Sequence, residues 1–303
     1  MACLCNTAYA QKRKSKPAPK PKPQPVQISA AELLYRNMLG ATAKVMFVDS
    51  VVVDKSLFLS AIPLNPEAGT LVSYPAFFKV HQHLDGSVYE NEFKNAIYFS
   101  MGDSTERMGI YTADRMGTQW SEPLKLREIG SEFEQQNYPF LMADGVTLFF
   151  AAKGANSLGG YDLFMTRKDT ETGKFFQPEN YGMPFNSTAN DYLLAIDEID
   201  NLGWLVSDRY QPEGMVCIYT FVPTAQRLAF KEGEVSNEQL EGFAKLTSIA
   251  DTWAFGNREK VLKSIEALKK RLTKTAAAVS FRFPINDDKV YTKLSDFKTK
   301  QGK

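Results

Sequence analysis

Hydrophobic residues in the middle of the chain recur as pairs of short strands. Three segments, "SYPAFF" from residue 73, "NYPFLM" from residue 137 and "NDYLLA" from residue 190, are each followed by an apolar strand, a turn and a second apolar strand. Apolar runs of this length between turn residues are typical of buried β-strands. The predicted pairs are Ile97 to Ser100 with Gly109 to Thr112, Leu148 to Ala151 with Tyr161 to Thr166, and Trp204 to Ser207 with Val216 to Phe221.

The repetition of this unit predicts an all-β propeller. The units start 64 and 53 residues apart, and the first is longer because of the inserted stretch "KVHQHLDGSVYENEFK". A propeller blade takes about 40 to 45 residues, so residues 44–226 have room for about four blades, in a complete or incomplete ring. Strands expected within residues 44–60 supply either a fourth blade or the strand that closes the ring.

A short amphipathic helix is expected before the β region, within residues 28–43. Ser29 is suited to cap its N-terminus, and Glu32 follows three residues later, which is the pattern of a capping box. The apolar residues at helical spacing are Leu33, Leu34, Met38 and Leu39.

A helical module with terminal strands is expected in residues 227–303. Ser236 and Gln239 form a second capping-box pair at the start of one helix. Gly256 and Asn257 interrupt the helical pattern before another amphipathic helix, so an αα-hairpin is predicted. The segment "AVSFRFPINDDKVYTKLSDF" is typical of a strand, a turn and a second strand, which we expect to pair with an exposed edge of the propeller.

The N-terminal segment resembles the end of a secretory signal. Residues 1–10, "MACLCNTAYA", are small and apolar and end in the A-x-A pattern of a signal peptidase site, as in a truncated signal peptide. Residues 11–27 alternate Pro with Lys, which predicts a disordered tether reaching about 50 Å. We therefore expect an exported protein, in the periplasm or associated with the outer membrane. The alternative is a disordered cytosolic tail.

Charge is segregated along the chain, although the formal net charge is only +1. Residues 255–303 carry 13 basic and 5 acidic side chains, residues 1–30 carry six basic and no acidic ones, and the region between them stands at −13. This acidic region argues against nucleic acid as a partner, because Lys and Arg neutralise phosphates in such complexes. The basic C-terminal module, at +8, either docks on the acidic region or serves a partner. No later segment has the ~20 apolar residues of a membrane span.

The second unit carries a family resemblance. The stretch "NYPFLMADGVTLFFAAKGANSLGGYDLFMTRKD", with "NYGMPFNSTANDYLLAID" after it, resembles the TolB-type, WD-repeat-like propeller units of exported Gram-negative envelope proteins. The resemblance covers residues 73–223, closely in the second unit and in outline in the other two. It implies a propeller that serves as a protein-binding platform. Nothing in the chain resembles the peptidoglycan-binding module that often follows such a propeller.

Few residues are candidates for metal binding or covalent catalysis. His81 and His83 would share one face of a strand and could ligate a metal, but no Cys or third His stands near them, so we interpret them as surface residues. Cys217 falls in a predicted buried strand without a histidine partner. That placement favours a small core side chain over a nucleophile, and cleavage after Ala10 would leave it as the one cysteine, without a disulfide.

Carboxylates beside the predicted strands are interpreted as structural. Asp at such positions normally accepts hydrogen bonds from its own backbone. The residues concerned are Asp144, Asp162 and Asp197.

One stretch favours a second interpretation. "TADRMGTQWSEP", residues 112–123, approximates the Asp-box of sialidases, with Asp114, Gly117 and Trp120 in order and one extra residue. In those enzymes the box is a structural turn. A glycosidase also needs a catalytic pair of acids, or a tyrosine with its carboxylate, and no spacing here marks such a pair.

These patterns favour a non-enzymatic, exported β-propeller that acts as a protein-binding scaffold in the periplasm or at the outer membrane. We expect envelope or periplasmic proteins as partners, and no metal, cofactor, nucleic acid or transmembrane span. The alternative is a carbohydrate-binding or glycoside-cleaving propeller that uses its central channel. The sequence assigns no catalytic residue and leaves the binding residues open.

Overall fold

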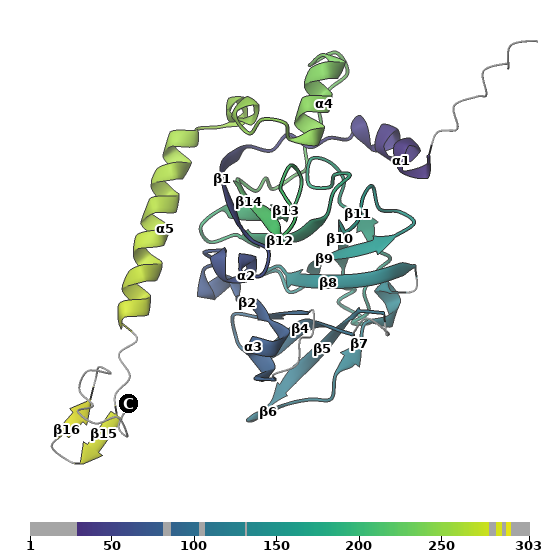
Figure 1. Ribbon diagram of the computed structural model, residues 1–303. Coiled ribbons are helices and arrows are strands. Elements are labelled where there is room, and N and C mark those ends of the chain that lie inside the picture. The colour runs from purple at the N-terminus through teal and green to yellow at the C-terminus, as the bar shows by residue number, and fades with distance from the viewer. Residues whose placement is uncertain are drawn as a thin grey trace, which may run out of the picture.

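The structure, a computed structural model, describes residues 29–80, 86–102, 107–130, 132–278, 283–286 and 289–291. Most of its strands belong to antiparallel sheets, none of which closes on itself, and its helices are few (Figure 1). The prediction of a mainly β fold is confirmed at this level. The expected signal segment and tether, residues 1–27, lie outside the described residues, as do His81 and His83.

Each of the three sequence units forms one antiparallel sheet, and we name these the first-unit, second-unit and third-unit sheets. Their strand orders are β2-β3-β4-β5-β6 with β7 on β5, β11-β10-β9-β8, and β1-β14-β13-β12. The predicted pairs are confirmed as β4 with β5, β9 with β10, and β13 with β14. The strands of the three sheets are β1 Phe47–Asp54, β2 Thr70–Ser73, β3 Ser87–Glu90, β4 Ala96–Met101, β5 Gly109–Met116, β6 Gln119–Trp120, β7 Leu124–Lys125, β8 Phe133–Leu141, β9 Thr147–Gly154, β10 Asp162–Arg167, β11 Glu179–Asn180, β12 Asp191–Asp197, β13 Leu202–Ser207 and β14 Met215–Phe221.

The N-terminal strand completes the third-unit sheet. β1 pairs antiparallel with β14, in a register that sets Val51 opposite Ile218. Residues 47–54 therefore extend the last sequence unit and do not form a blade of their own. The described residues hold three sheets of four or more strands, so the expected count of about four blades is not confirmed. The short helices between the strands are α2 Phe58–Ala61, η1 Pro66–Ala68, α3 Tyr74–Phe78 and η2 Arg127–Ile129.

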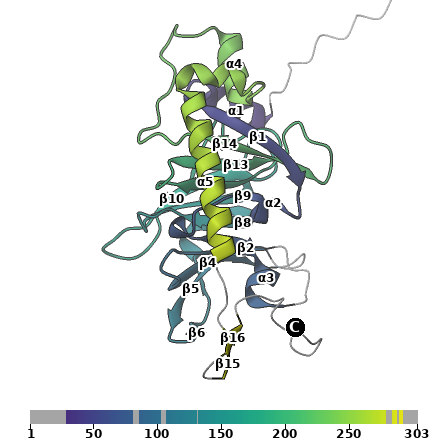
Figure 2. The ribbon, with the colours of Figure 1, turned by 90° about the vertical axis from the view of Figure 1, so that its left-hand side faces the viewer.

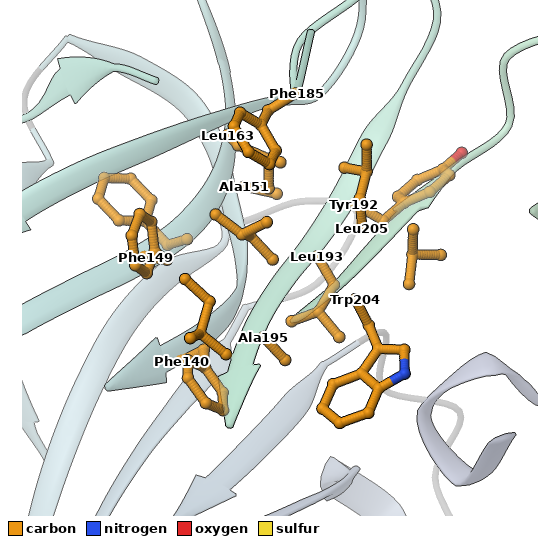
Figure 3. Close-up of a cluster of buried hydrophobic side chains, with 14 of the residues drawn as sticks. Phe140, Phe149, Ala151, Leu163, Phe185, Tyr192, Leu193, Ala195, Trp204 and Leu205 are labelled. Carbon is orange, nitrogen blue, oxygen red and sulfur yellow. The ribbon is translucent and has the colours of Figure 1, made fainter. Parts of the chain in front are cut away.

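The sheets pack on one another through an apolar core. β8 lies against β3, β4 and β5, and β12 lies against β8, β9 and β10. Figure 3 shows part of this core, which contains Phe149 and Leu163 of the second-unit sheet and Leu193 and Trp204 of the third-unit sheet. All four side chains are buried. Burying a Leu or Phe side chain stabilises a fold by roughly 1.5–3 kcal/mol, so this packing holds the neighbouring sheets together.

The Tyr-Pro pair at the start of the first two units takes two different conformations. In β8, Pro139 lies at a bulge, where the register shifts between Asn137 and Phe140 and a residue without an N–H is tolerated. In the first unit the same pair begins helix α3, with Pro75 in its first turn, where helices also accept Pro. At this position the repeated units thus share a sequence but not a backbone conformation.

Helix α1 (Ala30–Leu39) forms as predicted. The Ser29 side chain accepts a hydrogen bond from the backbone N–H of Glu32 at 3.1 Å. Its apolar face packs on α4 and on a small buried cluster that contains Leu158 and Met183. The N-terminal helix is therefore attached to the loops of the second-unit sheet.

The predicted αα-hairpin is wrong, although both of its helices form. α4 (Asn237–Lys245) packs on α1, whereas α5 (Arg258–Ala278) runs down the flank of the sheets (Figures 1 and 2). The cause is the 3₁₀ turn η3 (Ala250–Phe255) between them. Within it, the Thr252 hydroxyl accepts from the backbone N–H of Phe47 at 2.9 Å, and Trp253 Nε1 donates to the Phe47 carbonyl at 3.0 Å. These bonds fix the connection to β1 and send α5 along the third-unit sheet.

Helix α5 docks on the third-unit sheet through apolar and polar contacts. Ile265 and Leu268 are buried against the core. Arg258 Nε donates to the Val48 carbonyl at 2.8 Å, and Arg271 forms an ion pair with Asp200. The basic helix α5 thus lies on the acidic β region. This is the first of the two arrangements that the charge distribution suggested, docking on that region rather than binding a partner. No helix in the described part of the chain is long and apolar enough to cross a membrane. The terminal strands β15 (Phe283–Asn286) and β16 (Lys289–Tyr291) pair with each other and with no other described strand, so the expected pairing with an edge of the propeller was wrong for the described residues.

Candidate functional site

Three tyrosines from the repeated motifs meet where the second-unit and third-unit sheets adjoin. Tyr138 comes from "NYPF", Tyr161 from "GGYD" and Tyr192 from "NDYL". Their ring centroids are 6.4 Å apart between Tyr138 and Tyr161, 5.9 Å between Tyr138 and Tyr192, and 5.9 Å between Tyr161 and Tyr192. Aromatic pairs at such distances attract one another beyond the burial of their area. We name this group the tyrosine cluster.

The bulge in β8 aims Tyr138 into the cluster. Its backbone φ is 54°, in the left-handed region that costs a non-glycine residue free energy. The side chain of Asn137 accepts from the Tyr138 N–H at 2.8 Å, and the Tyr138 ring packs on Phe58 at 5.3 Å. The surrounding contacts therefore hold a conformation that the residue alone would avoid.

The Gly159-Gly160 turn positions Tyr161. A Cβ on Gly160 would lie 2.0 Å from Asn190 Oδ1, so only glycine lets the turn approach this side chain. That same oxygen accepts from the Tyr161 N–H at 3.1 Å. The double glycine of the motif thus ties the start of β10 to the start of β12.

Charged groups border the cluster on two sides. Lys55 Nζ donates to the Tyr192 hydroxyl at 2.8 Å, and this hydroxyl donates to Asp208 Oδ2, also at 2.8 Å. Burial, reinforced by the bond to Asp208, raises the pKa of Tyr192 well above its usual value, so its phenol stays neutral. In Figure 3 the ring of Tyr192 lies at the rim of the apolar core. Lys153 Nζ lies 4.5 Å from the centroid of the Tyr161 ring, a cation–π contact.

A buried polar network supports the cluster from behind. Arg209 and Asp191 form an ion pair at 2.6 Å with both side chains buried. Asp162 accepts from the N–H groups of Leu158 at 2.8 Å and Gly159 at 3.2 Å, and from the amide of Asn180 at 2.8 Å. Burial raises the pKa of Asp162 to about 7 against these stabilising hydrogen bonds. Both carboxylates are occupied by structural partners.

The outer side of the cluster offers groups that can bind a partner. Tyr138 and Tyr161 are half-buried, with Lys153 half-buried and Lys55 exposed beside them. The described residues contain no group of three or more His, Cys, Asp or Glu side chains able to hold a metal. A half-exposed aromatic surface bordered by ammonium groups offers stacking, hydrogen bonds and cation–π contacts to a partner.

The carboxylates that the sequence predicts to be structural accept hydrogen bonds from backbone N–H groups of their own turns. Asp144 accepts from the N–H groups of Val146 and Thr147, both at 2.8 Å. Asp197 accepts from the N–H groups of Ile199 and Asp200, at 2.9 and 3.1 Å. The interpretation of these residues, and of Asp162, as backbone acceptors is confirmed.

Cys217 and the Asp-box-like stretch also have structural roles. Cys217 is buried in β14, and burial raises the pKa of its thiol, which disfavours the nucleophilic thiolate. Asp114 and Trp120 lie on the hairpin of β5 and β6, with Gly117 at a φ of 65° in its turn. The guanidinium of Arg115 lies 5.5 Å from the Trp120 ring. This stretch is a local turn, and the Trp120 ring also packs on Phe77 of α3, with 5.9 Å between the ring centroids.

The sequence did not single out the tyrosine cluster, although it contained a signal. Each of the three aligned motifs contains a tyrosine, at the second position in Tyr74 and Tyr138 and one position later in Tyr192. Two of these meet, while Tyr74 packs on Phe78 at 4.5 Å within the first unit. Lys55 precedes the units and Lys153 lies within the second one, and the sequence pattern singled out neither lysine.

Comparisons with known proteins identify no relative. No protein-family model matches the chain, and no curated protein and no solved structure does so either.

Proposed function

We propose that this protein is a non-enzymatic, exported scaffold of the β-propeller type that binds other proteins in the periplasm or at the outer membrane. The observation that carries the proposal is the tyrosine cluster with Lys55 and Lys153 beside it. Tyr is enriched at protein interfaces because its ring supplies contact area and its hydroxyl supplies hydrogen bonds.

The sheet arrangement supports the propeller part of the proposal. Three antiparallel sheets adjoin in series, and the N-terminal strand β1 is the outer strand of the last one. Propellers commonly consist of such four-stranded blades, and their stability comes from contacts between neighbouring blades. Ring closure and a count of about four blades belong to the proposal.

The position of the cluster supports the proposed role as a platform. Its rings come from two sheets and are held by the buried Arg209–Asp191 pair and by the bulge at Tyr138. A surface built on packed sheets loses little conformational freedom when a partner binds, which favours affinity. The TolB-type resemblance of residues 73–223 and the A-x-A pattern before Gln11 support an envelope location.

The test is crosslinking in intact native cells, with a C-terminally tagged chain and with the same chain carrying Tyr161→Ala and Lys153→Glu. We expect stoichiometric envelope proteins on the tagged chain, with at least a tenfold loss on the variant, about 1.4 kcal/mol or more. Mass spectrometry of the same sample reads the mature N-terminus, expected at Gln11.

A matched control carries Phe176→Ser and Lys174→Glu, which also removes an aromatic ring and reverses a lysine at exposed positions, away from the cluster. This control should keep its partners. An uncleaved chain that captures no protein would overturn both the location and the scaffold role.

The second candidate is a carbohydrate-binding or glycoside-cleaving propeller. The same rings would stack on sugar faces, and Asp208 lies beside Tyr192. Turnover of a glycoside by the purified protein, abolished by Asp208→Asn, would replace the scaffold proposal with this one.

A further inference from the structure

A second candidate site lies at the seam between the first-unit and second-unit sheets. A cavity of about 610 Å³ opens there, between β5 and β7 on one side and the turn after β10 on the other. Its volume falls within the ~300–1,000 Å³ of small-molecule sites. None of its walls comes from the tyrosine cluster, so it is independent of the scaffold role.

Aromatic rings form the floor of this cavity. Tyr98 and Phe175 are nearly buried and meet edge to face at 6.3 Å between centroids. Burial raises the pKa of Tyr98 above its usual value, so it keeps its proton as a hydrogen-bond donor. The Tyr111 ring is half-exposed, with Lys125 Nζ 5.6 Å from its centroid.

Three cations line the same cavity. Lys125, Arg127 and Lys168 each have a side chain at its wall, and none of them forms a salt bridge with a described carboxylate. They occur in a region whose formal charge is −13, so the cavity is a local exception to the acidic surroundings. Asp114, Glu128 and Thr112 supply the other polar side chains of the lining.

We propose that this cavity binds an acidic saccharide. The carboxylate of a sugar acid would lie among the three cations, its hydroxyls would donate to Asp114 and Glu128, and its C–H face would rest on the aromatic floor. The charge-assisted hydrogen bonds between the carboxylate and the cations are the strongest of these contacts. The hydrogen bonds of the hydroxyls and the contact with the rings fix the orientation of the sugar.

Each part of the lining excludes a simpler ligand. An apolar molecule would cover five charged side chains without pairing any of them, which is unfavourable. A bare inorganic anion would use the cations but leave the two carboxylates and the aromatic floor unengaged. The combination of cations, acids and rings is matched by a molecule that carries a carboxylate, hydroxyls and a ring.

The experiment is calorimetric titration of the full chain with digalacturonate, beside neutral galactobiose and inorganic phosphate. We expect digalacturonate to bind with a Kd below about 5 mM, and the other two to bind at least tenfold more weakly. The double variant Arg127→Glu, Lys168→Glu should weaken digalacturonate at least tenfold. Lys174→Glu is the matched control, because Lys174 lies in the same turn but not at the cavity wall.

The outcomes separate cleanly. The thermal unfolding temperature of each variant is measured as well. A value equal to that of the wild type shows that a loss of binding is not caused by a loss of folding. Equal binding of galactobiose would overturn the role of the cations, and equal binding of phosphate would reduce the site to an anion site. No binding of digalacturonate, or unchanged binding by the double variant, would overturn the proposal. Tyr161→Ala should leave this binding unchanged, which distinguishes the cavity from the tyrosine cluster.

Discussion

The guanidinium of Arg209 lies 2.6 Å from the carboxylate of Asp191, and both side chains are buried. Arg209 also donates to the carbonyls of Pro184 at 2.8 Å and Phe185 at 2.7 Å. The pair therefore joins the first residue of β12 to the loop before it. Because Tyr192 follows Asp191 directly, the pair also fixes the base of the tyrosine cluster.

Removing one partner of this pair should destabilise the fold strongly. Arg209→Ala leaves Asp191 charged and buried without its cation, and we expect a loss of about 3–5 kcal/mol in the free energy of unfolding. Urea denaturation followed by tryptophan fluorescence measures it. The matched control is Arg36→Ala, which breaks an exposed pair with Glu32 at 2.9 Å and should cost less than about 1 kcal/mol. Equal, small effects of both substitutions would contradict a structural role for the buried pair.

Stability should fall as the pH rises through the range in which Asp162 ionises. Burial raises the pKa of this carboxyl to about 7 in the folded chain, whereas an unfolded Asp titrates near ~3.9. Between these values the native state binds a proton that the unfolded state has released, so ionisation opposes folding by up to an order of 4 kcal/mol. Asp162→Asn should flatten the stability profile between about pH 4 and pH 7, measured by urea denaturation at each pH.

Asp144→Asn is the control of opposite sign. Burial alone would raise the pKa of Asp144, but hydrogen bonds from Thr147 and Val146 outweigh it and hold the pKa below its usual value. A depressed pKa contributes stability that is lost only as the pH falls toward the folded-state pKa. This variant should therefore change the acid limb of the profile and leave its slope above pH 5 intact. The same slope in wild type and Asp162→Asn would show that another group carries it.

The three strand pairs were predictable because their signal is local. Each consists of short apolar runs around a turn, and Gly159 and Gly160 mark one of these turns. The membership of β1 in the third-unit sheet was not predictable, since it pairs residues such as Val51 and Ile218 that are far apart in the chain. Local periodicity specifies a strand but not its distant partner.

The same limit explains the αα-hairpin and the tyrosine cluster. Helical spacing predicted α4 and α5, but their arrangement depends on a hydrogen bond that Thr252 accepts from Phe47 and one that Trp253 donates to it, about 205 residues away in sequence. The cluster likewise depends on how two sheets pack, which brings Tyr161 to Tyr192 and leaves Tyr74 elsewhere. The motif tyrosines could be identified in the sequence, but only the tertiary structure shows which of them are in contact.

Helix α5 should loosen when its buried apolar contact is removed. Leu268 is buried against the third-unit sheet, and Leu268→Ala deletes that contact at a cost of about 2–5 kcal/mol. We expect faster hydrogen exchange in α5 and in β1, measured by mass spectrometry of peptic fragments. Lys270→Ala, on the exposed side of the same helix, should leave both rates unchanged. Exchange in β1 that stays slow while α5 opens would show that the helix does not protect the strand.

A methyl group at Gly203 should disrupt the third-unit sheet. Gly203 in β13 lies opposite Phe221 in β14, and a Cβ there would lie 2.3 Å from the Phe221 ring. The ring is buried beside Phe47 and Phe185, so it has little room to move, and Gly203→Ala should cost about 1–3 kcal/mol in unfolding free energy by urea denaturation. Gly40→Ala is the matched control, because nothing lies within 4 Å of its Cβ and its φ is −65°. That substitution should be neutral or stabilise by up to about 1 kcal/mol, since it restricts the unfolded chain. Equal stabilities of the two variants would mean that Phe221 does not rest on Gly203 in solution.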